Sequence, residues 1–104
     1  MRREDAAAAL QGALALSHEI LAVADSGDVQ RVTNLDAERR RLLKSLQHVV
    51  RSLDEGELSV LRTIADVNAQ SLGRMEHRFR AKCRDMDMLA AGRRALRAYG
   101  NNRP

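Results

Sequence analysis

The residue types that most often carry out catalysis or bind metals are sparse in this 104-residue chain. Its histidines are His18, His48 and His77, and none has a second metal-ligating residue three or four positions further on, as one helix face would require. Cys83 is the single cysteine, so no internal disulfide can form, and no arrangement of His and Asp accompanies it as a nucleophile would need. We therefore predict no catalytic residues and no metal site, and we interpret Cys83 as a half-buried structural thiol.

Two cations at apolar positions raise one enzymatic alternative. Arg39 and Lys82 interrupt rows of apolar residues, and small helical enzymes such as the chorismate mutases of the helical type line an anion pocket with side chains of this kind. A long cationic side chain on a narrow apolar row more often extends to solvent along its aliphatic stem. The glycines are isolated, so there is no phosphate-binding loop. We expect both cations to reach solvent, and we expect neither enzymatic activity nor a cofactor.

Helices must position these side chains, and the longest helical pattern extends from Leu58 to Leu89 without a proline. Its apolar residues recur at intervals of three and four or their sums, and they are Leu58, Leu61, Ala65, Leu72, Met75, Phe79, Met86 and Leu89. Asn68 and Lys82 interrupt this row. A helix of this length depends on partners packed along it, because an isolated helix is only marginally stable in water.

The rest of the chain predicts shorter helices. We expect helices at about 4–25, 29–53 and 55–91, and a short C-terminal helix at 93–99 because Gly92 favours a break. The predicted fold is all-α, with residues 1–104 forming a single domain, an antiparallel helical bundle of three main helices plus the short C-terminal helix.

Local signals mark the ends of these helices. Gly27 suits a left-handed C-cap and Asp28 a side-chain N-cap, so the first two helices are joined tightly and run antiparallel. Asp54 and Glu57 have the spacing of a capping box at the start of the third helix. Asp36 and Arg40 are placed to form an exposed ion pair.

The N-terminal residues superficially resemble a signal peptide. Arg2 and Arg3 precede an Ala- and Leu-rich run, but polar residues such as Glu4, Asp5 and Gln11 break its apolar region. No apolar run approaches the roughly 20 residues of a membrane span. We predict a cytoplasmic protein without membrane insertion.

Positive charge is concentrated in the C-terminal third. Up to Gly73 the chain has 9 Lys and Arg against 11 Asp and Glu, a net charge of −2, whereas the remainder has 9 against 3, a net charge of +6. A basic region of this kind could neutralise nucleic-acid phosphates. Interleaved acids at Glu76, Asp85 and Asp87, and the near absence of aromatic residues for base stacking, favour an acidic protein surface as its partner. A basic regulator that binds nucleic acid remains the competing class.

Large, flexible apolar residues continue beyond Gly73. They are Met75, Phe79, Met86, Met88 and Leu89, and methionine-rich surfaces suit the binding of partner helices. The first two helices are too short to cover this region. Either the last segment of the chain folds back over these residues, or another protein binds them. Both hold if the last segment is a cover that the other protein displaces.

Three segments occur in an order typical of one family. Gly27-Asp28-Val29 is followed by residues 35–43 (LDAERRRLL), a short acidic turn and then a Leu, an acid, Glu-Arg and paired Leu. Asn68 lies in the middle of the third helix, and residues 92–100 read GRRALRAYG. In these features the chain resembles the FliT-type flagellar export chaperones, over about residues 27–100.

This resemblance implies a small cytosolic chaperone, not an enzyme, that binds the C-terminal helical region of the filament-cap protein before export. Members of the family also contact the export ATPase complex and the export gate, and some restrain the flagellar master transcription activator. A tyrosine near the C terminus takes part in docking at the export gate, and Tyr99 matches its position.

The chain also departs from the family pattern. It stops soon after Tyr99, without the longer tail of some members, and Val29 or Val32 stands where the family often has an aromatic residue. These departures put regulation by a tail and the role with the transcription activator in doubt. The FlgN-type chaperones of hook-associated proteins are a related alternative, and the client and the oligomeric state, a homodimer included, stay open.

The predicted client site is a groove between the second and third helices that accepts an amphipathic helix. Its residues are Leu42, Leu46, Met75, Phe79, Met86 and Leu89. Binding in this groove would keep the client's helix from assembling prematurely until the client is delivered to the export gate. This mechanism needs no cofactor.

Overall fold

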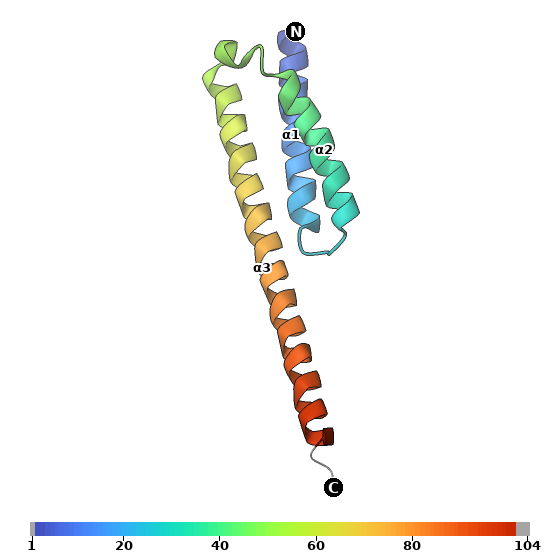
Figure 1. The fold of residues 1–104 in the computed structure, drawn as a ribbon. Coiled ribbons are helices and arrows are strands. Elements are labelled where there is room, and N and C mark those ends of the chain that lie inside the picture. Colours follow the sequence, from blue (N-terminus) through green and yellow to red (C-terminus); the bar gives the residue numbers. More distant parts are fainter. Residues whose placement is uncertain (1, 102–104) are drawn as a thin grey trace.

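The computed structural model describes the backbone of residues 2–101 and the side chains of residues 2–98. Its elements are α1 (Arg3–Val23), α2 (Val29–Ser45), the 3-10 turn η1 (Val50–Ser52) and α3 (Glu55–Asn101). The fold is all-helical, as the sequence predicts. In Figure 1, α2 returns beside α1 towards the N terminus, and α3 then runs back along the pair and continues far past it.

The turn between α1 and α2 has the predicted chemistry. Gly27 has φ 79°, a left-handed conformation that costs glycine little because it has no Cβ. The Asp28 carboxylate caps α2 by accepting a hydrogen bond of 3.1 Å from the backbone N–H of Arg31. These two residues reverse the chain and let α2 pack beside α1.

The core forms around α1, which packs against both α2 and α3, whereas α2 and α3 make no close backbone contact with each other. Small residues on α1 let its neighbours approach closely. At Gly12, an added Cβ would lie 3.0 Å from Leu42 Cδ1. The main cluster of buried residues is Ala6, Ala9, Leu10, Ala13, Leu46 and Ile64. Burying apolar surface in this cluster is the main source of the hairpin's stability.

The prediction that the second helix extends to residue 53 is wrong, because α2 ends at Ser45. The Ser45 hydroxyl donates to the Leu42 carbonyl over 2.5 Å, which competes with regular helical bonding, and the β-branched pair of Val49 and Val50 favours helix less than its neighbours do. The resulting bend packs Val49 and Leu53 against the core cluster. A straight helix over 29–53 would extend roughly 37 Å and run past the end of α1.

The predicted break at Gly92 is also wrong, since α3 continues through it to Asn101 as one helix of 47 residues. A single glycine costs a helix only about 1 kcal/mol relative to alanine, and the Ala, Leu and Arg residues around it are strong helix formers. There is no separate helix at 93–99. The molecule is therefore elongated, with extents of 80 × 21 × 20 Å.

Arg39 corrects the expectation that both cations on the apolar rows reach solvent. Arg39 is only 8% exposed. Nη2 forms a 2.6 Å ion pair with Asp36 Oδ1, and Nη1 donates to Ser17 Oγ over 3.4 Å. Asp36 also pairs with Arg40 at 2.9 Å, as the sequence predicts. Lys82, in contrast, is exposed. Because Arg39 is satisfied by neighbouring side chains, it has a structural role between α1 and α2.

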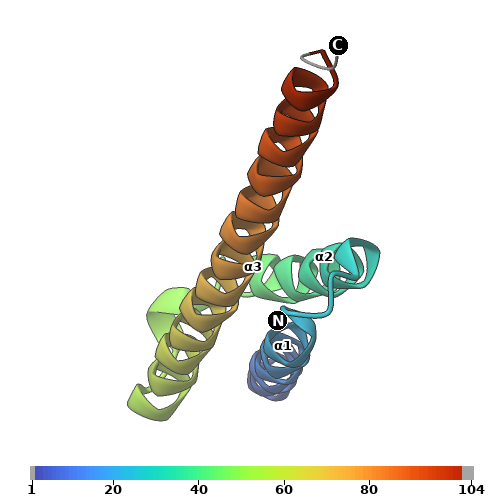
Figure 2. The ribbon, with the colours of Figure 1, turned by 90° about the horizontal axis from the view of Figure 1, so that it is seen from below.

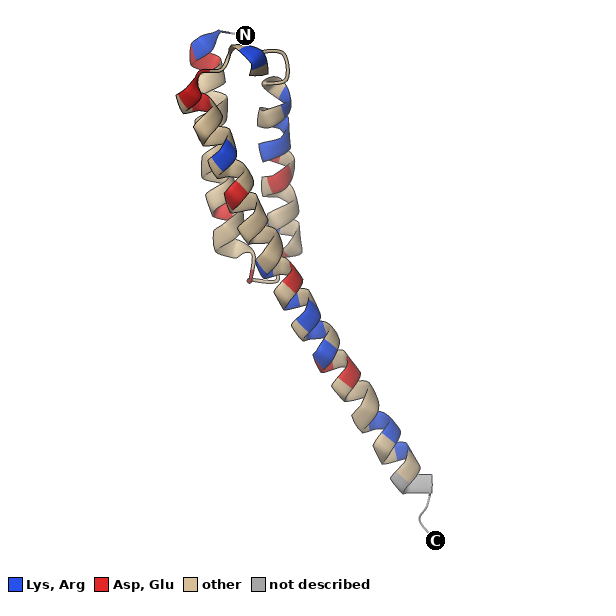
Figure 3. Ribbon diagram, turned by 90° about the vertical axis from the view of Figure 1, so that its left-hand side faces the viewer, with Lys and Arg blue, Asp and Glu red and all other residues tan. Residues whose placement is uncertain are grey.

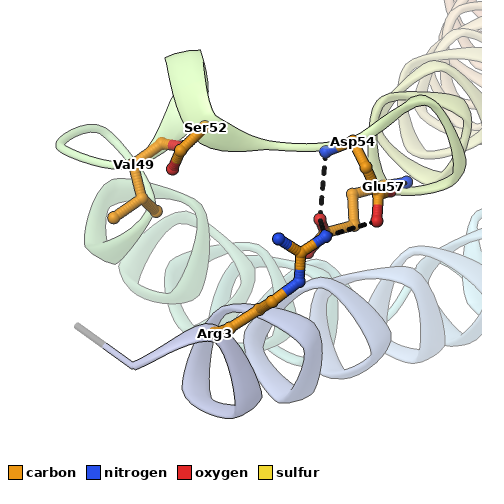
Figure 4. A network of polar contacts seen from close by, with 5 residues as sticks. All are labelled: Arg3, Val49, Ser52, Asp54 and Glu57. Carbon is orange, nitrogen blue, oxygen red and sulfur yellow. Dashed lines mark hydrogen bonds and ion pairs between the residues drawn. The ribbon is translucent and has the colours of Figure 1, made fainter.

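Polar side chains fix the start of α3 (Figure 4). The Asp54 carboxylate accepts from the Glu57 backbone N–H at 2.8 Å, and the Glu57 carboxylate accepts from the Asp54 N–H at 3.0 Å. This reciprocal pair confirms the predicted capping box. Arg3, at the start of α1, forms ion pairs with both carboxylates and so links the two helix starts. The hydrogen bond from the Glu57 backbone N–H lowers the pKa of Asp54 from its usual 3.8, and Arg3 lowers it further.

Candidate partner-binding surface

The apolar side chains of α3 change from buried to mostly exposed along the helix. Ile64, Val67 and Ser71 are buried where the helix lies along the hairpin. The mostly exposed apolar residues further along α3, here called the outer stripe, are Leu72, Met75, Phe79, Met86, Leu89 and Leu96. Phe79 is 70% exposed and Leu96 is 73% exposed. The outer stripe is therefore a long apolar surface without a partner among the described residues.

The outer stripe lies mostly on the part of α3 that leaves the hairpin. Figure 2 shows this half of the helix extending away from α1 and α2. From Gly73 to Leu96 the helix has no long-range packing of the kind that buries Ile64 or Val67, and its large apolar side chains are exposed except for half-buried Met75. Contiguous apolar surface of this kind typically marks an interaction site.

Where α3 leaves the hairpin, it forms a hollow with the turn between α1 and α2. This end hollow has a volume of about 540 Å³. Its lining is Ala24, Gly27, Asp28, Val29, Val32, Thr33, Met75, Arg78, Phe79 and Lys82. Val29 and Phe79 are both mostly exposed and stand on opposite helices of this hollow. The end hollow joins the outer stripe, because Met75 and Phe79 belong to both.

Two arginines of α3 hold the walls of the end hollow in place. Arg78 Nη1 donates to the Asp25 carbonyl, and Arg74 Nη1 donates to the Leu21 carbonyl over 3.3 Å. The Leu21 carbonyl lies in the last turn of α1 and the Asp25 carbonyl in the turn that follows, where the negative end of the helix dipole favours a cation. The arginines therefore fix α3 against the end of the hairpin.

The structure does not bring the predicted groove residues together in one place. Leu46 is 2% exposed, and it belongs to the core with Leu42 packed against it, at the opposite end of the hairpin from the end hollow. Met75 and Phe79 line the end hollow, and Met86 and Leu89 lie further along the outer stripe. Four of the six predicted residues thus share a surface, while Leu42 and Leu46 stabilise the hairpin.

The sequence analysis missed the residues by which α1 and α2 contribute to this surface. Ala24, Val29 and Val32 line the end hollow. A separate shallow groove between α2 and α3, of about 320 Å³, is lined by Leu43 and Leu61 among others. Val29 and Val32 start the heptad pattern of α2, and their place directly after the turn at Gly27 is the sequence signal that could have identified them.

The remaining predicted site residue, Tyr99, lies in α3, but its side chain is outside the described residues. No cluster of three or more metal-ligating side chains exists among the residues that the structure describes. In the same residues Cys83 is a free, half-buried cysteine.

Of the described helices, only α1 is long and apolar enough to span a membrane by length and composition. Its most apolar window has a mean hydropathy of 1.4 and is 33% buried in the fold. Core helices of water-soluble proteins pass the same test, and α1 packs against both other helices. This property is weak support for a membrane span.

The described residues form an elongated helical hairpin whose long third helix exposes a stripe of large apolar side chains. A family model described as "Flagellar protein FliT" matches residues 7–101, so the chain belongs to the FliT family of flagellar export chaperones. The searches of curated proteins and of solved structures found no match. The family assignment agrees with the resemblance in the sequence.

Proposed function

We propose that this protein is a cytoplasmic flagellar export chaperone that binds the C-terminal helical region of the filament-cap protein. The observation that carries the proposal is the exposure of the outer stripe, in which Phe79, Met86 and Leu89 are all more than 60% exposed. A client helix that covers these side chains removes apolar surface from water on both partners, which is the main driving force of such association.

The dimensions of the outer stripe suit an amphipathic helix. From Met75 to Leu96 the stripe extends roughly 32 Å along α3, the length of a partner helix of about 21 residues. Methionine side chains at positions 75 and 86 adapt to different partner surfaces because they are unbranched and flexible. One end of the client helix would fill the end hollow between Val29 and Phe79. Leu42 and Leu46 have no part in this binding mode.

Binding would also explain how assembly is prevented. A client segment held on the outer stripe is unavailable for polymerisation, and its release at the export gate returns it to the assembly pathway. Tyr99 of this chain matches the family's gate-docking tyrosine, so we assign it contact with the export gate. The export ATPase complex is the second expected partner in the export machinery. Neither role requires an enzymatic activity or a cofactor.

The test is a binding measurement with the double variant Phe79→Asp and Met86→Asp. The two side chains are exposed, so their replacement leaves the hairpin folded, but each carboxylate must lose its hydration when the client helix docks. Calorimetry with the filament-cap C-terminal segment should show micromolar binding for the wild type and loss of at least about tenfold in affinity for the variant.

The matched control is the double variant His77→Asp and Ala91→Asp, which adds carboxylates to the same helix on the side away from the outer stripe. It should bind the client like the wild type. A Phe79→Asp and Met86→Asp variant that stays helical and still binds with wild-type affinity would refute the proposed surface. Absence of binding by the wild type, with strongly salt-dependent binding to arbitrary duplex DNA, would favour the basic nucleic-acid regulator instead.

A further inference from the structure

Two cations stand in line with the apolar residues of the outer stripe, and their positions restrict the chemistry of the partner. From Leu72 to Leu96 the positions facing one side follow a strict spacing of three and four. They are Leu72, Met75, Phe79, Lys82, Met86, Leu89, Arg93 and Leu96. This is the heptad spacing of a coiled-coil seam, extending roughly 36 Å along the helix. Lys82 and Arg93 occupy two of the seam positions, 11 residues apart.

We propose that the outer stripe is a coiled-coil seam for an acidic amphipathic helix that places carboxylates opposite Lys82 and Arg93. This inference rests on the proposed function, since it names the chemistry of the client helix on the same surface. Polar residues at single seam positions fix the register and choice of partner in coiled coils, because an unpaired charge in the seam is costly.

Both cations are free to make such pairs. Lys82 and Arg93 are exposed, and neither takes part in an ion pair within the described part of the chain. Acidic residues beside the seam do not neutralise Lys82 and Arg93, because the two acids there, Glu76 and Asp85, are matched in number by two more cations, Arg78 and Arg97. The seam region therefore keeps a net charge of +2. Figure 3 shows that positively charged bands dominate the end of the described part of α3.

This charge argues against a second copy of the chain as the occupant. A parallel pair in register would place Lys82 against Lys82 and Arg93 against Arg93, which is repulsive. An antiparallel pair would place Lys82 against Met86 and Arg93 against Met75, so that each cation loses hydration without gaining a counter-charge. A partner helix with carboxylates at two core positions, 11 residues apart, can be aligned so that one carboxylate pairs with Lys82 and the other with Arg93.

The test uses two synthetic helices of about 28 residues with leucine at the core positions. One probe has Glu at two core positions 11 residues apart, and the other has Lys at the same positions. We expect the wild-type chain to bind the Glu probe on the order of tenfold more tightly than the Lys probe, as measured by fluorescence anisotropy. The double variant Lys82→Glu and Arg93→Glu should reverse this preference.

The matched control is Arg84→Glu with Arg94→Glu, which makes the same change in net charge at exposed positions off the seam. It should weaken Glu-probe binding slightly and keep the preference. If the control reverses the preference as strongly as the seam variant does, general electrostatics and not the seam would explain it. Unchanged preference in the seam variant would also overturn the inference.

A parallel titration separates this inference from the proposed function. If the filament-cap segment binds and charge reversal at Lys82 and Arg93 does not weaken it, the chaperone function stands and the charge register is wrong. If that segment does not bind but the Glu probe shows the reversal, the register stands and the assigned client is wrong. A wild-type dimer that Phe79→Asp dissociates, but Lys82→Glu with Arg93→Glu does not, would identify a second copy as the occupant.

Discussion

The guanidinium group of Arg39 lies buried against the hydroxyl group of Ser17, and this contact joins α2 to α1 inside a largely apolar interface. Arg39 Nη1 donates to Ser17 Oγ over 3.4 Å, and the Ser17 hydroxyl in turn donates to the Ala13 carbonyl over 2.8 Å. Asp36 supplies the counter-charge at 2.6 Å. The cation that interrupts the apolar row of α2 is therefore buried with its hydrogen-bonding groups paired.

The first prediction concerns the stability of this contact. Arg39→Ala should lower the free energy of unfolding by about 1–3 kcal/mol, because it removes buried packing and charge-assisted hydrogen bonds. Arg40→Ala is the matched control, since Arg40 pairs with the same Asp36 but has a side chain that is 79% exposed. Its cost should be about 0.5 kcal/mol or less. Urea denaturation followed by circular dichroism measures both, and equal costs would contradict the structural role of Arg39.

The sequence predicts the local features of this fold because their causes lie within a few residues. The turn is determined by Gly27 with Asp28, and the cap of α3 by Asp54 with Glu57. Both depend on hydrogen bonds and backbone conformations within a few residues, so distant parts of the chain do not alter them. The end of α2 depends on weaker local signals, the Ser45 hydroxyl and β-branched Val49 and Val50, and also on the length of α1. A heptad pattern over 29–53 cannot reveal that its last residues must bend to stay against the core.

The face of α3 that packs in the core was equally hard to predict. The row predicted from Leu58 to Leu89 reaches the core through Leu61, but the most deeply buried residues of α3, Ile64, Val67 and Ser71, lie beside that row. Alanines and serine on α1 favour close approach by compact side chains, and this preference depends on the shape of both helices. Four of the six predicted groove residues lie on the free surface because α3 extends past the hairpin, whereas Leu46 lies in the core and Leu42 packs against it.

A second prediction compares the same substitution at two glycines. Gly27→Ala should cost about 1–2 kcal/mol, because Gly27 has a left-handed backbone and an added Cβ would displace the Arg78 guanidinium. Gly73→Ala should stabilise the protein by roughly 0.5–1 kcal/mol, because it lies inside α3 with no atom near the new methyl group. Thermal unfolding of both variants tests this, and two shifts of the same sign would contradict it.

A third prediction follows from the lowered pKa of Asp54. Its carboxylate is stabilised in the folded state, first by the Glu57 backbone N–H and then by Arg3, while in the unfolded chain the pKa returns to its usual range near 3.8. This contribution to stability is therefore fully present above the unfolded pKa, and it is lost as the pH falls through the lower, folded pKa.

Asp54→Asn isolates this effect, because asparagine can still cap the helix but cannot ionise. Unfolding by urea at pH 6, pH 4 and pH 3 should show a stability difference between wild type and variant that narrows towards acidic pH. A constant difference over this range would mean that the Asp54 charge does not contribute to stability.

The fourth prediction uses the exposed half of α3 to follow binding. Backbone amides beyond residue 80 belong to a helix with little tertiary packing, so in the free chain they should exchange with solvent much faster than those of 60–71, where α3 is buried against the hairpin. Adding the filament-cap segment should slow exchange in residues 80–96 and leave 60–71 nearly unchanged, because only the first region gains a partner. Strong protection beyond residue 80 in the free chain would contradict an uncovered stripe, and a dilution series identifies its cause. Protection that falls on dilution indicates self-association, since only contacts between chains depend on concentration, whereas constant protection indicates that the chain covers its own stripe.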